Sequence, residues 1–273
     1  MTSELIRTWR DLLDRYGDFK SGQWCFRGDR AGRGLKTSLE RAAIDRWERD
    51  WPEMPDIENG LLRRFKREAH LYLTREPDED DIIGWLSLMR HHGAPTRLHD
   101  WTYSFFVAVY FALNRADADE QPCIWAMNLG RIREVVEAKT HLRNLLNDDP
   151  NAKKQVTVDA IINSSPRHAL VFPLNPSKMN QRLILQQSVF VVPGDITKPF
   201  MENLGAVDVP DKVVVKMPLP SERTFLQEAT KELLAMNMSS ATLFPGLDGF
   251  GQNLAALIPF PELRAVDTKV GRE

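Results

Sequence analysis

The stretch Leu88–Thr102, Leu-Met-Arg-His-His-Gly-Ala-Pro-Thr-Arg-Leu-His-Asp-Trp-Thr, constrains the fold more than any other. Gly93 can adopt a positive φ, and Pro95 fixes its own φ while disfavouring helical geometry at the residue before it. We therefore expect a helix that ends near His92, a turn, and a second helix that starts near Thr102. A polar loop between two apolar helices is a typical place for a functional site.

The elements around this loop alternate irregularly between helix and strand. Residues 103–113 are apolar on nearly every side, which favours a buried central helix, although their β-branched and aromatic content also permits a strand. Irregular alternation favours an α+β fold, a small mixed sheet surrounded by helices. Strands are expected at 23–28, 121–127, 169–172 and 213–217, a short helix followed by a buried strand at 180–193, and helices at 3–17, 57–73, 130–163, 221–236 and 250–258.

Composition excludes several classes of protein. Lysine and arginine number 36 and aspartate and glutamate 38, so the net charge of −2 creates no general attraction to nucleic acid or anionic membranes. No apolar run approaches the roughly 20 residues that span a bilayer, and the N-terminus does not resemble a signal peptide. Cys25 and Cys123 lie in apolar, strand-like segments and are expected to be buried thiols. These features predict a cytoplasmic protein without a membrane partner.

A glycine-rich basic segment follows the first expected strand. Gly28, Gly32 and Gly34 have neither the spacing of a dinucleotide fingerprint nor the Gly-Lys-Ser/Thr of a phosphate-binding P-loop. Two interpretations remain open. The segment could hold phosphate oxygens through backbone N–H groups and arginine side chains, or it could be an ordinary solvated loop.

Polar residues recur where the apolar elements are interrupted, namely at Arg27, His92, Arg97, Asp100 and Gln187. In one hypothesis they form a nucleotide site. Arg27 and Arg97 would hold phosphate, His92 and Asp100 would act as an acid–base pair, and Gln187 would contact a ribose or base. In the other hypothesis the arginines and Asp100 form a buried ion-pair network that braces the loop and needs no ligand.

The sequence contains residues for two further kinds of site. A metal site could use His91, His92, His99 and Asp100, but neighbouring helical residues point about 100° apart, so no metal is expected. A non-enzymatic module that binds nucleic acid or a partner protein could use the basic cluster of Arg30, Arg33, Lys36, Arg41 and Arg46. The near-neutral net charge counts against that cluster as a nucleic-acid surface.

Ordered sequence blocks resemble the FRG domain family, which takes its name from a Phe-Arg-Gly triplet. The blocks are Phe26-Arg-Gly28, Leu35-x2-Ser-Leu-x-Arg41, His92-Gly-Ala-Pro-Thr-Arg-Leu-His-Asp-Trp-Thr102 with Val107-Ala-x-Tyr-Phe-Ala112, Arg182-x3-Gln-Gln-x-x-Phe190, and Leu243-Phe-Pro-Gly-Leu-Asp-Gly249. Three positions depart from the usual family pattern. Arg90 stands in place of a glutamine, His99 in place of a leucine, and Ser188 in place of a glycine.

The resemblance implies an N-terminal helix at 1–21, an FRG domain at 22–258 and a C-terminal tail at 259–273. It also implies a bacterial or phage protein with a role in anti-phage defence. FRG domains look distantly similar to ADP-ribosyltransferases, which implies an NAD-directed transferase or NAD glycohydrolase. On this basis the catalytic candidates are Arg27, His92, Asp100 and Gln187, and the candidates for binding NAD are Arg27, Gly28, Thr96 and Arg97.

One feature of the sequence conflicts with transferase chemistry. Such an enzyme needs a glutamate near position 187 to stabilise the oxocarbenium-like ribose, whereas Gln186 and Gln187 are neutral amides. Either the transferase activity is weak or absent, or another carboxylate such as Asp100 or Glu228 serves. The alternative function is a non-enzymatic FRG module that binds nucleic acid or a partner protein.

Overall fold

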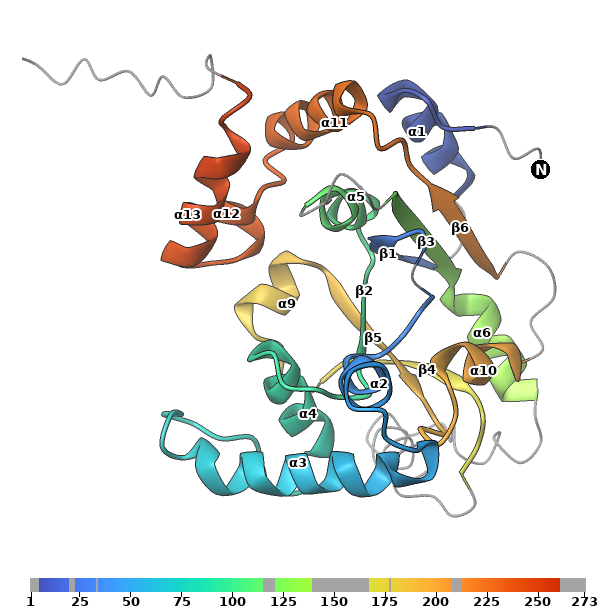
Figure 1. Cartoon of the computed structure of the whole chain (residues 1–273), viewed down its shortest axis with the longest axis vertical. Coiled ribbons are helices and arrows are strands. Elements are labelled where there is room, and N and C mark those ends of the chain that lie inside the picture. The colour runs from blue at the N-terminus through green and yellow to red at the C-terminus, as the bar shows by residue number, and fades with distance from the viewer. Residues whose placement is uncertain are drawn as a thin grey trace, which may run out of the picture.

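A computed structural model describes residues 5–19, 23–32, 34–114, 121–138, 167–176, 178–207 and 213–260. Its centre is a six-stranded sheet in the order β4-β5-β2-β1-β3-β6, in which every neighbouring pair is antiparallel (Figure 1). The strands are β1 (Trp24–Arg30), β2 (His99–Thr102), β3 (Pro122–Asn128), β4 (Val171–Leu174), β5 (Ser188–Pro193) and β6 (Val214–Pro218).

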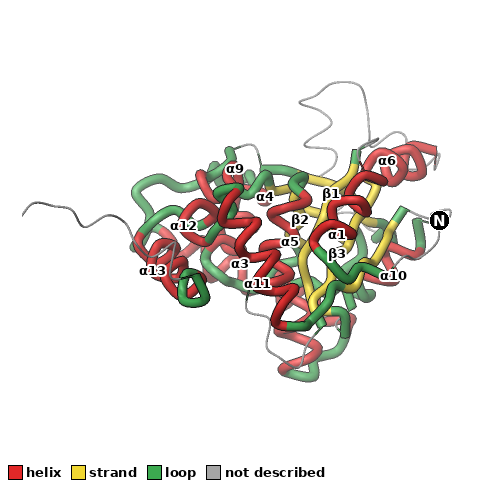
Figure 2. The backbone as a smooth tube through the Cα atoms, turned by 90° about the horizontal axis from the view of Figure 1, so that it is seen from above, coloured by secondary structure: helices red, strands yellow, loops and turns green. Residues whose placement is uncertain are grey.

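Helices surround this sheet, as expected for the α+β class, which is confirmed. They are α1 (Trp9–Tyr16), α2 (Ser38–Glu40), α3 (Met54–Ala69), α4 (Ile82–His91), α5 (Phe105–Leu113), α6 (Leu129–Ala138), α9 (Gln181–Leu185), α10 (Phe200–Gly205), α11 (Arg223–Ala235), α12 (Ser240–Leu243) and α13 (Leu247–Ala256). The other helical segments are the 3-10 helices η1 (Gly17–Phe19) and η3 (Trp51–Glu53) and the π-helix η2 (Arg41–Arg46). Seen from above, α12 and α13 lie at the opposite end of the molecule from α6 and α10 (Figure 2).

The sheet consists of two halves that meet at a single pair of residues. Strand β1 pairs with β3 along its whole length, from Trp24↔Asn128 to Arg30↔Pro122. Strand β2 pairs with β5 in the same continuous manner. Between β1 and β2, however, the only registered pair is Phe26↔Thr102. Beyond this pair the two half-sheets diverge.

Helix α5 is the central element of the larger core. It is almost entirely apolar and is buried between β1 on one side and α1 and α11 on the other. Phe26 packs edge-to-face on Phe105 with 5.2 Å between ring centroids. Gly28 allows the close approach, because a Cβ there would lie 2.1 Å from the carbonyl oxygen of Ala108 and 2.3 Å from the amide nitrogen of Ala112.

The opposite face of the sheet carries a second core. Cys25, Trp101 and Val191 point into it, in alternation with their strand neighbours. Both cysteines are buried as expected, and both thiols are free. Burial raises the pKa of the Cys25 thiol well above its usual value and that of Cys123 to about 11, so both thiols are protonated at neutral pH.

Most expected elements are confirmed, with ends that shift by a few residues. Residues 105–113 form a helix rather than a strand. The second helix starts at Phe105, three residues after the expected start near Thr102, and strand β2 at His99–Thr102 was not expected. Ser104 caps α5 by accepting a hydrogen bond from the Val107 amide at 3.3 Å.

Two of the expected helices lie partly outside the described residues. The first helix is shorter than expected, since Thr8 caps α1 with a capping box and Ser3 lies outside the described residues. Most of the helical region expected at 130–163 also lies outside them. Within the described part, no helix combines the length and the apolar character needed to cross a membrane.

The close approach at Gly28 makes a direct prediction. Gly28→Ala forces a methyl group into the backbone of α5, so we expect it to lower the free energy of unfolding by about 3 kcal/mol or more. Urea denaturation measures this change. Gly32→Ala is the matched control, because Gly32 is exposed with no atom within 4 Å of an added Cβ, and its effect should stay within about 0.5 kcal/mol. Equal effects of the two substitutions would contradict this view of the helix–strand contact.

Candidate functional site

A cleft opens where the two half-sheets diverge. It has two adjoining lobes that share Gly28, His91, Phe111 and Arg182. The outer lobe, of about 900 Å³, lies between the end of β1, α9 and α13. The inner lobe, of about 360 Å³, lies over β1, β2 and β5 and is bordered by α4 and α9. The cleft therefore depends on the separation of β1 from β2.

Arg27 occupies the gap between the separating strands. If the register Phe26↔Thr102 continued, Gly28 would lie opposite Asp100 and the backbones would pair there. Instead, Nη1 of Arg27 donates a hydrogen bond to the carbonyl oxygen of Asp100 at 2.8 Å. Its Nε donates to Oδ2 of Asp29 at 3.0 Å. One guanidinium group thus joins a backbone carbonyl of β2 to a side-chain carboxylate of β1 where the ladder ends.

The carboxylate of Asp100 is held by a second arginine. Nε of Arg90, on α4, donates to Oδ2 of Asp100 at 2.7 Å, and Nη2 of Arg90 contacts the same oxygen. The Asp100 side chain is 38% exposed and lines the inner lobe. This carboxylate is therefore accessible from the cleft, but its negative charge is largely balanced by Arg90.

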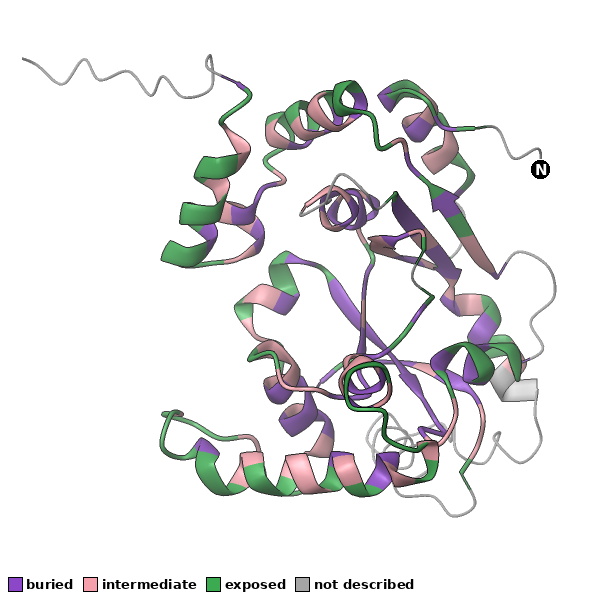
Figure 3. Ribbon diagram, viewed as in Figure 1, coloured by how far each residue is buried: buried purple, intermediate pink, exposed green. Residues whose placement is uncertain are grey.

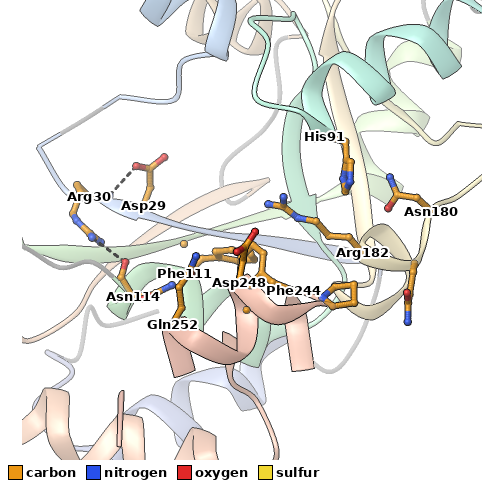
Figure 4. Close-up of a pocket in the computed structure, with 14 residues that line it drawn as sticks. Asp29, Arg30, His91, Phe111, Asn114, Asn180, Arg182, Phe244, Asp248 and Gln252 are labelled. Atoms are coloured by element: carbon orange, nitrogen blue, oxygen red, sulfur yellow. Dashed lines mark hydrogen bonds between the residues drawn. The ribbon is translucent and has the colours of Figure 1, made fainter. Parts of the chain in front are cut away.

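Among the described residues that line the cleft, Arg182 is an arginine whose guanidinium group forms no hydrogen bond or ion pair. It lies in the short helix α9, which Asn180 caps by accepting a hydrogen bond from the Leu183 amide at 2.9 Å. The guanidinium carbon lies 4.6 Å from the centroid of the Phe244 ring. Among the described residues no carboxylate or carbonyl group accepts a hydrogen bond from Arg182, and its side chain extends into the outer lobe (Figure 4). Burial lowers the pKa of this guanidinium, and Arg90 contributes in the same direction, while Asp100 opposes both.

His91 lies beside Arg182 and lines both lobes. Burial lowers the pKa of its imidazole, and the neighbouring His92 and Arg182 lower it further. His91 is therefore neutral at pH 7, able to donate from one ring nitrogen and accept at the other.

The comparisons with known proteins bear on this region. Residues 22–121 match the model of the FRG domain. The chain contains an FRG domain. Comparison with curated proteins and with solved structures gave no match. Similarity of this fold to ADP-ribosyltransferases therefore stays a prediction, as does the extension of the FRG domain to residue 258.

The structure gives the FRG triplet a physical meaning. Phe26 belongs to the apolar core, Arg27 fills the gap between the half-sheets, and Gly28 admits α5. Gly28 was expected to bind a cofactor through its backbone. It lines both lobes, but its lack of a side chain is required by the helix behind it rather than by a ligand.

Two of the residues expected to bind NAD do not line the cleft. Thr96 is fully buried, its amide donates to Oγ of Ser38 at 3.0 Å, and Ser38 donates back to the Thr96 carbonyl oxygen at 3.1 Å. Arg97 is buried against Glu58. Its amide donates to Oε1 at 2.9 Å and its Nε to Oε2 at 2.6 Å. For Arg97 the ion-pair interpretation therefore describes the geometry, and it lines neither lobe.

For two further candidates, the residue that lines the cleft is the sequence neighbour of the one expected. His92 ends α4 and is exposed, while its neighbour His91 lines the cleft. Gln187 is exposed at a positive φ of 47°, and its carbonyl oxygen accepts the amide of Tyr103 at 2.9 Å. Gln186 is buried and lines the inner lobe instead. Of the expected site residues, Arg27, Gly28 and Asp100 meet in the cleft, and Thr96, Arg97, His92 and Gln187 do not line it.

The remaining histidine of the loop, His99, is packed in the interior of the protein. His99 is buried, and its ring stacks on Phe200 with 4.5 Å between centroids. Burial lowers the pKa of His99 well below its usual value, with Arg27, Arg41 and Arg90 acting in the same direction. Within the described residues no three His, Cys, Asp or Glu side chains are grouped closely enough to hold a metal ion.

Part of the basic cluster proposed for nucleic acid is engaged within the protein, while Arg46 is exposed. Arg30 is buried and donates to the carbonyl oxygen of Ala112, and Lys36 pairs with Asp45 at 2.7 Å. Arg33 lies outside the described residues. Glu228, the alternative carboxylate, is exposed on α11 and lines neither lobe. Arg182, which the sequence marks only through its family block, lines the cleft and has no acceptor among the described residues.

The Arg97–Glu58 pair predicts a stability effect that is independent of any ligand. Arg97→Ala would leave a buried carboxylate without its cation, so we expect a loss of about 3–5 kcal/mol in the free energy of unfolding. Denaturation in urea tests this. Arg64→Ala is the control, because the Arg64–Glu68 pair is exposed and worth about 0.5 kcal/mol or less. A loss at Arg97 no larger than that at Arg64 would contradict the structural role.

Proposed function

We propose that the cleft binds a nucleotide of the NAD type and that Arg182 holds its phosphate groups. The observation that carries this proposal is the half-buried guanidinium of Arg182, which meets no acceptor among the described residues. Removing a charged group from water is costly unless a partner compensates it. The other arginines that line the cleft have such partners: Asp29 for Arg27, Asp100 for Arg90, and the carbonyl oxygens of Ala112 and Asn114 for Arg30.

Phosphate is the partner that fits Arg182 best. A guanidinium group presents its N–H donors in a planar fork that matches phosphate and carboxylate oxygens. Phe244 already covers one face of this plane, which orients the fork and leaves its edge available to a ligand. Neutral His91 beside it can donate a further hydrogen bond to a phosphate oxygen.

The size and lining of the cleft favour a nucleotide over inorganic phosphate. Lobes of about 900 and 360 Å³ compare with pockets of roughly 300–1,000 Å³ that hold small molecules. The aromatic rings of Phe111 and Phe244 provide apolar surface for a base. The amides of Asn180 and Gln252 provide donors and acceptors for hydroxyl groups and ring nitrogens. A dinucleotide could occupy both lobes.

The inner lobe contains a carboxylate that could take part in cleavage of NAD. Cleavage of the bond between nicotinamide and ribose develops positive charge, which a carboxylate stabilises. Asp100 is the carboxylate that lines the inner lobe, and its pairing with Arg90 weakens the stabilisation it can give. Binding is therefore the function that we propose first, and NAD glycohydrolase or transferase activity would have to use Asp100. A role in anti-phage defence stays a prediction from the family.

Titration calorimetry of the purified full chain with NAD tests the proposal. We expect saturable binding that Arg182→Gln weakens by about 10- to 100-fold, since the substitution removes charge-assisted hydrogen bonds worth about 1.5–3 kcal/mol. Arg182→Lys, which keeps the charge but loses the fork, should give an intermediate affinity. Arg64→Ala, on the exposed side of α3, should leave the affinity unchanged.

The melting temperature of each variant controls for misfolding. The proposal fails if the wild-type chain binds neither NAD nor ADP-ribose at millimolar concentrations. It also fails if Arg182→Gln binds as tightly as the wild type.

A further inference from the structure

Helix α13 borders the outer lobe with a polar face and turns an apolar face away from it, and both faces are exposed. Asp248, Gly249 and Gln252 line the outer lobe. On the opposite side Leu247, Phe250 and Leu254 are 81%, 52% and 52% exposed. Successive helical residues are separated by about 100°, so these two sets fall on opposite faces. Figure 3 shows the outer side of α13 as mostly exposed.

Burial of apolar surface cannot explain this orientation, because it would turn the apolar face toward the protein. The contact with α12 explains it instead. A Cβ at Gly249 would lie 1.9 Å from the carbonyl oxygen of Phe244 and 2.7 Å from that of Ser240. Only glycine permits this approach, and it fixes α13 with Asp248 and Gln252 toward the cleft. The polar face is therefore directed at the site by a specific backbone contact.

Asp248 has the properties of a ligand-recognising group. Its carboxylate extends into the same space as the side chain of Arg182 (Figure 4), yet the two form no ion pair within 4.0 Å. Among the described residues it receives no hydrogen bond from a side chain. A carboxylate only accepts hydrogen bonds, so its natural partners in a nucleotide are the hydroxyl groups of a ribose. The same negative charge disfavours a phosphate group at that position.

We infer that Asp248 and Gln252 bind the free ribose hydroxyls of the ligand and make the site selective against a 2′-phosphate. This inference rests on the proposed function and deepens it. Arg182 would hold the phosphate groups that link the two halves of the ligand, and α13 would hold the adjacent ribose. The ligand class is then a dinucleotide with an unmodified ribose, NAD rather than NADP.

A structural role for Asp248 alone makes a different prediction. An acidic residue in the first turn of a helix stabilises it through the helix dipole. Loss of that effect would lower the stability of α13 and weaken every ligand equally. The ratio of two affinities, for ligands that differ only in the 2′-phosphate, separates recognition from stability.

The test compares the dissociation constants of NAD and NADP for the wild-type chain, Asp248→Asn and Arg182→Gln, measured by titration calorimetry. We expect the wild type to bind NAD about tenfold more tightly than NADP, since one repulsion between nearby charges at the protein surface has this magnitude. Asp248→Asn keeps the shape of the side chain and removes its charge, so the ratio should fall to about one. Arg182→Gln should weaken both ligands and leave the ratio nearly unchanged. Asp81→Asn, on the far end of α4, should alter neither.

The outcomes distinguish the two proposals. If the wild type binds NAD through Arg182 but the ratio is one, or Asp248→Asn leaves the ratio unchanged, the inference about α13 is overturned and the proposed function stands. If no nucleotide binds, both are overturned.

Discussion

The organisation of this protein depends on where the hydrogen-bonded pairing of strands β1 and β2 ends. Strands β1 and β2 share a single registered pair, Phe26↔Thr102, and then separate. A sheet that splits would expose unpaired backbone groups, which is unfavourable in a partly buried position. The guanidinium group of Arg27 removes part of this cost by donating to the carbonyl oxygen of Asp100 and to Asp29. The cleft can therefore exist without disrupting the sheet.

The arginines in the cleft and beside it have distinct functions that follow from their partners. Arg97 is buried against Glu58 and stabilises the loop, and Arg90 balances Asp100. Arg182 rests on an aromatic ring and meets no acceptor among the described residues, so it is the cation that a ligand can use. Helix α13, whose orientation Gly249 determines, adds an acidic group to the same lobe. Separate cationic and anionic groups in one lobe suit a ligand that has both phosphates and hydroxyls.

Local patterns in the sequence predicted most helices and strands. They also predicted that Arg27 and Asp100 lie in one site. They could not distinguish Arg97 from Arg182, because the partner that buries Arg97 lies 39 residues away at Glu58. The choice between His91 and His92, and between Gln186 and Gln187, depended on helix phase and on a positive φ at Gln187. Each error was a shift of one residue, which is enough to move a side chain from the cleft to solvent. The polar inner face of α13 was not predicted, since it reverses the usual amphipathic pattern.

Hydrogen–deuterium exchange of the full chain, with and without saturating NAD, tests the central claim most directly, because it locates the ligand without any substitution. The account predicts slower exchange in α9 (Gln181–Leu185), α13 (Leu247–Ala256) and the end of β1, and unchanged exchange in α3 (Met54–Ala69). Slower exchange confined to α3 or α10, with none in α9 and α13, would show that the ligand binds elsewhere and that the cleft between the half-sheets is not the site.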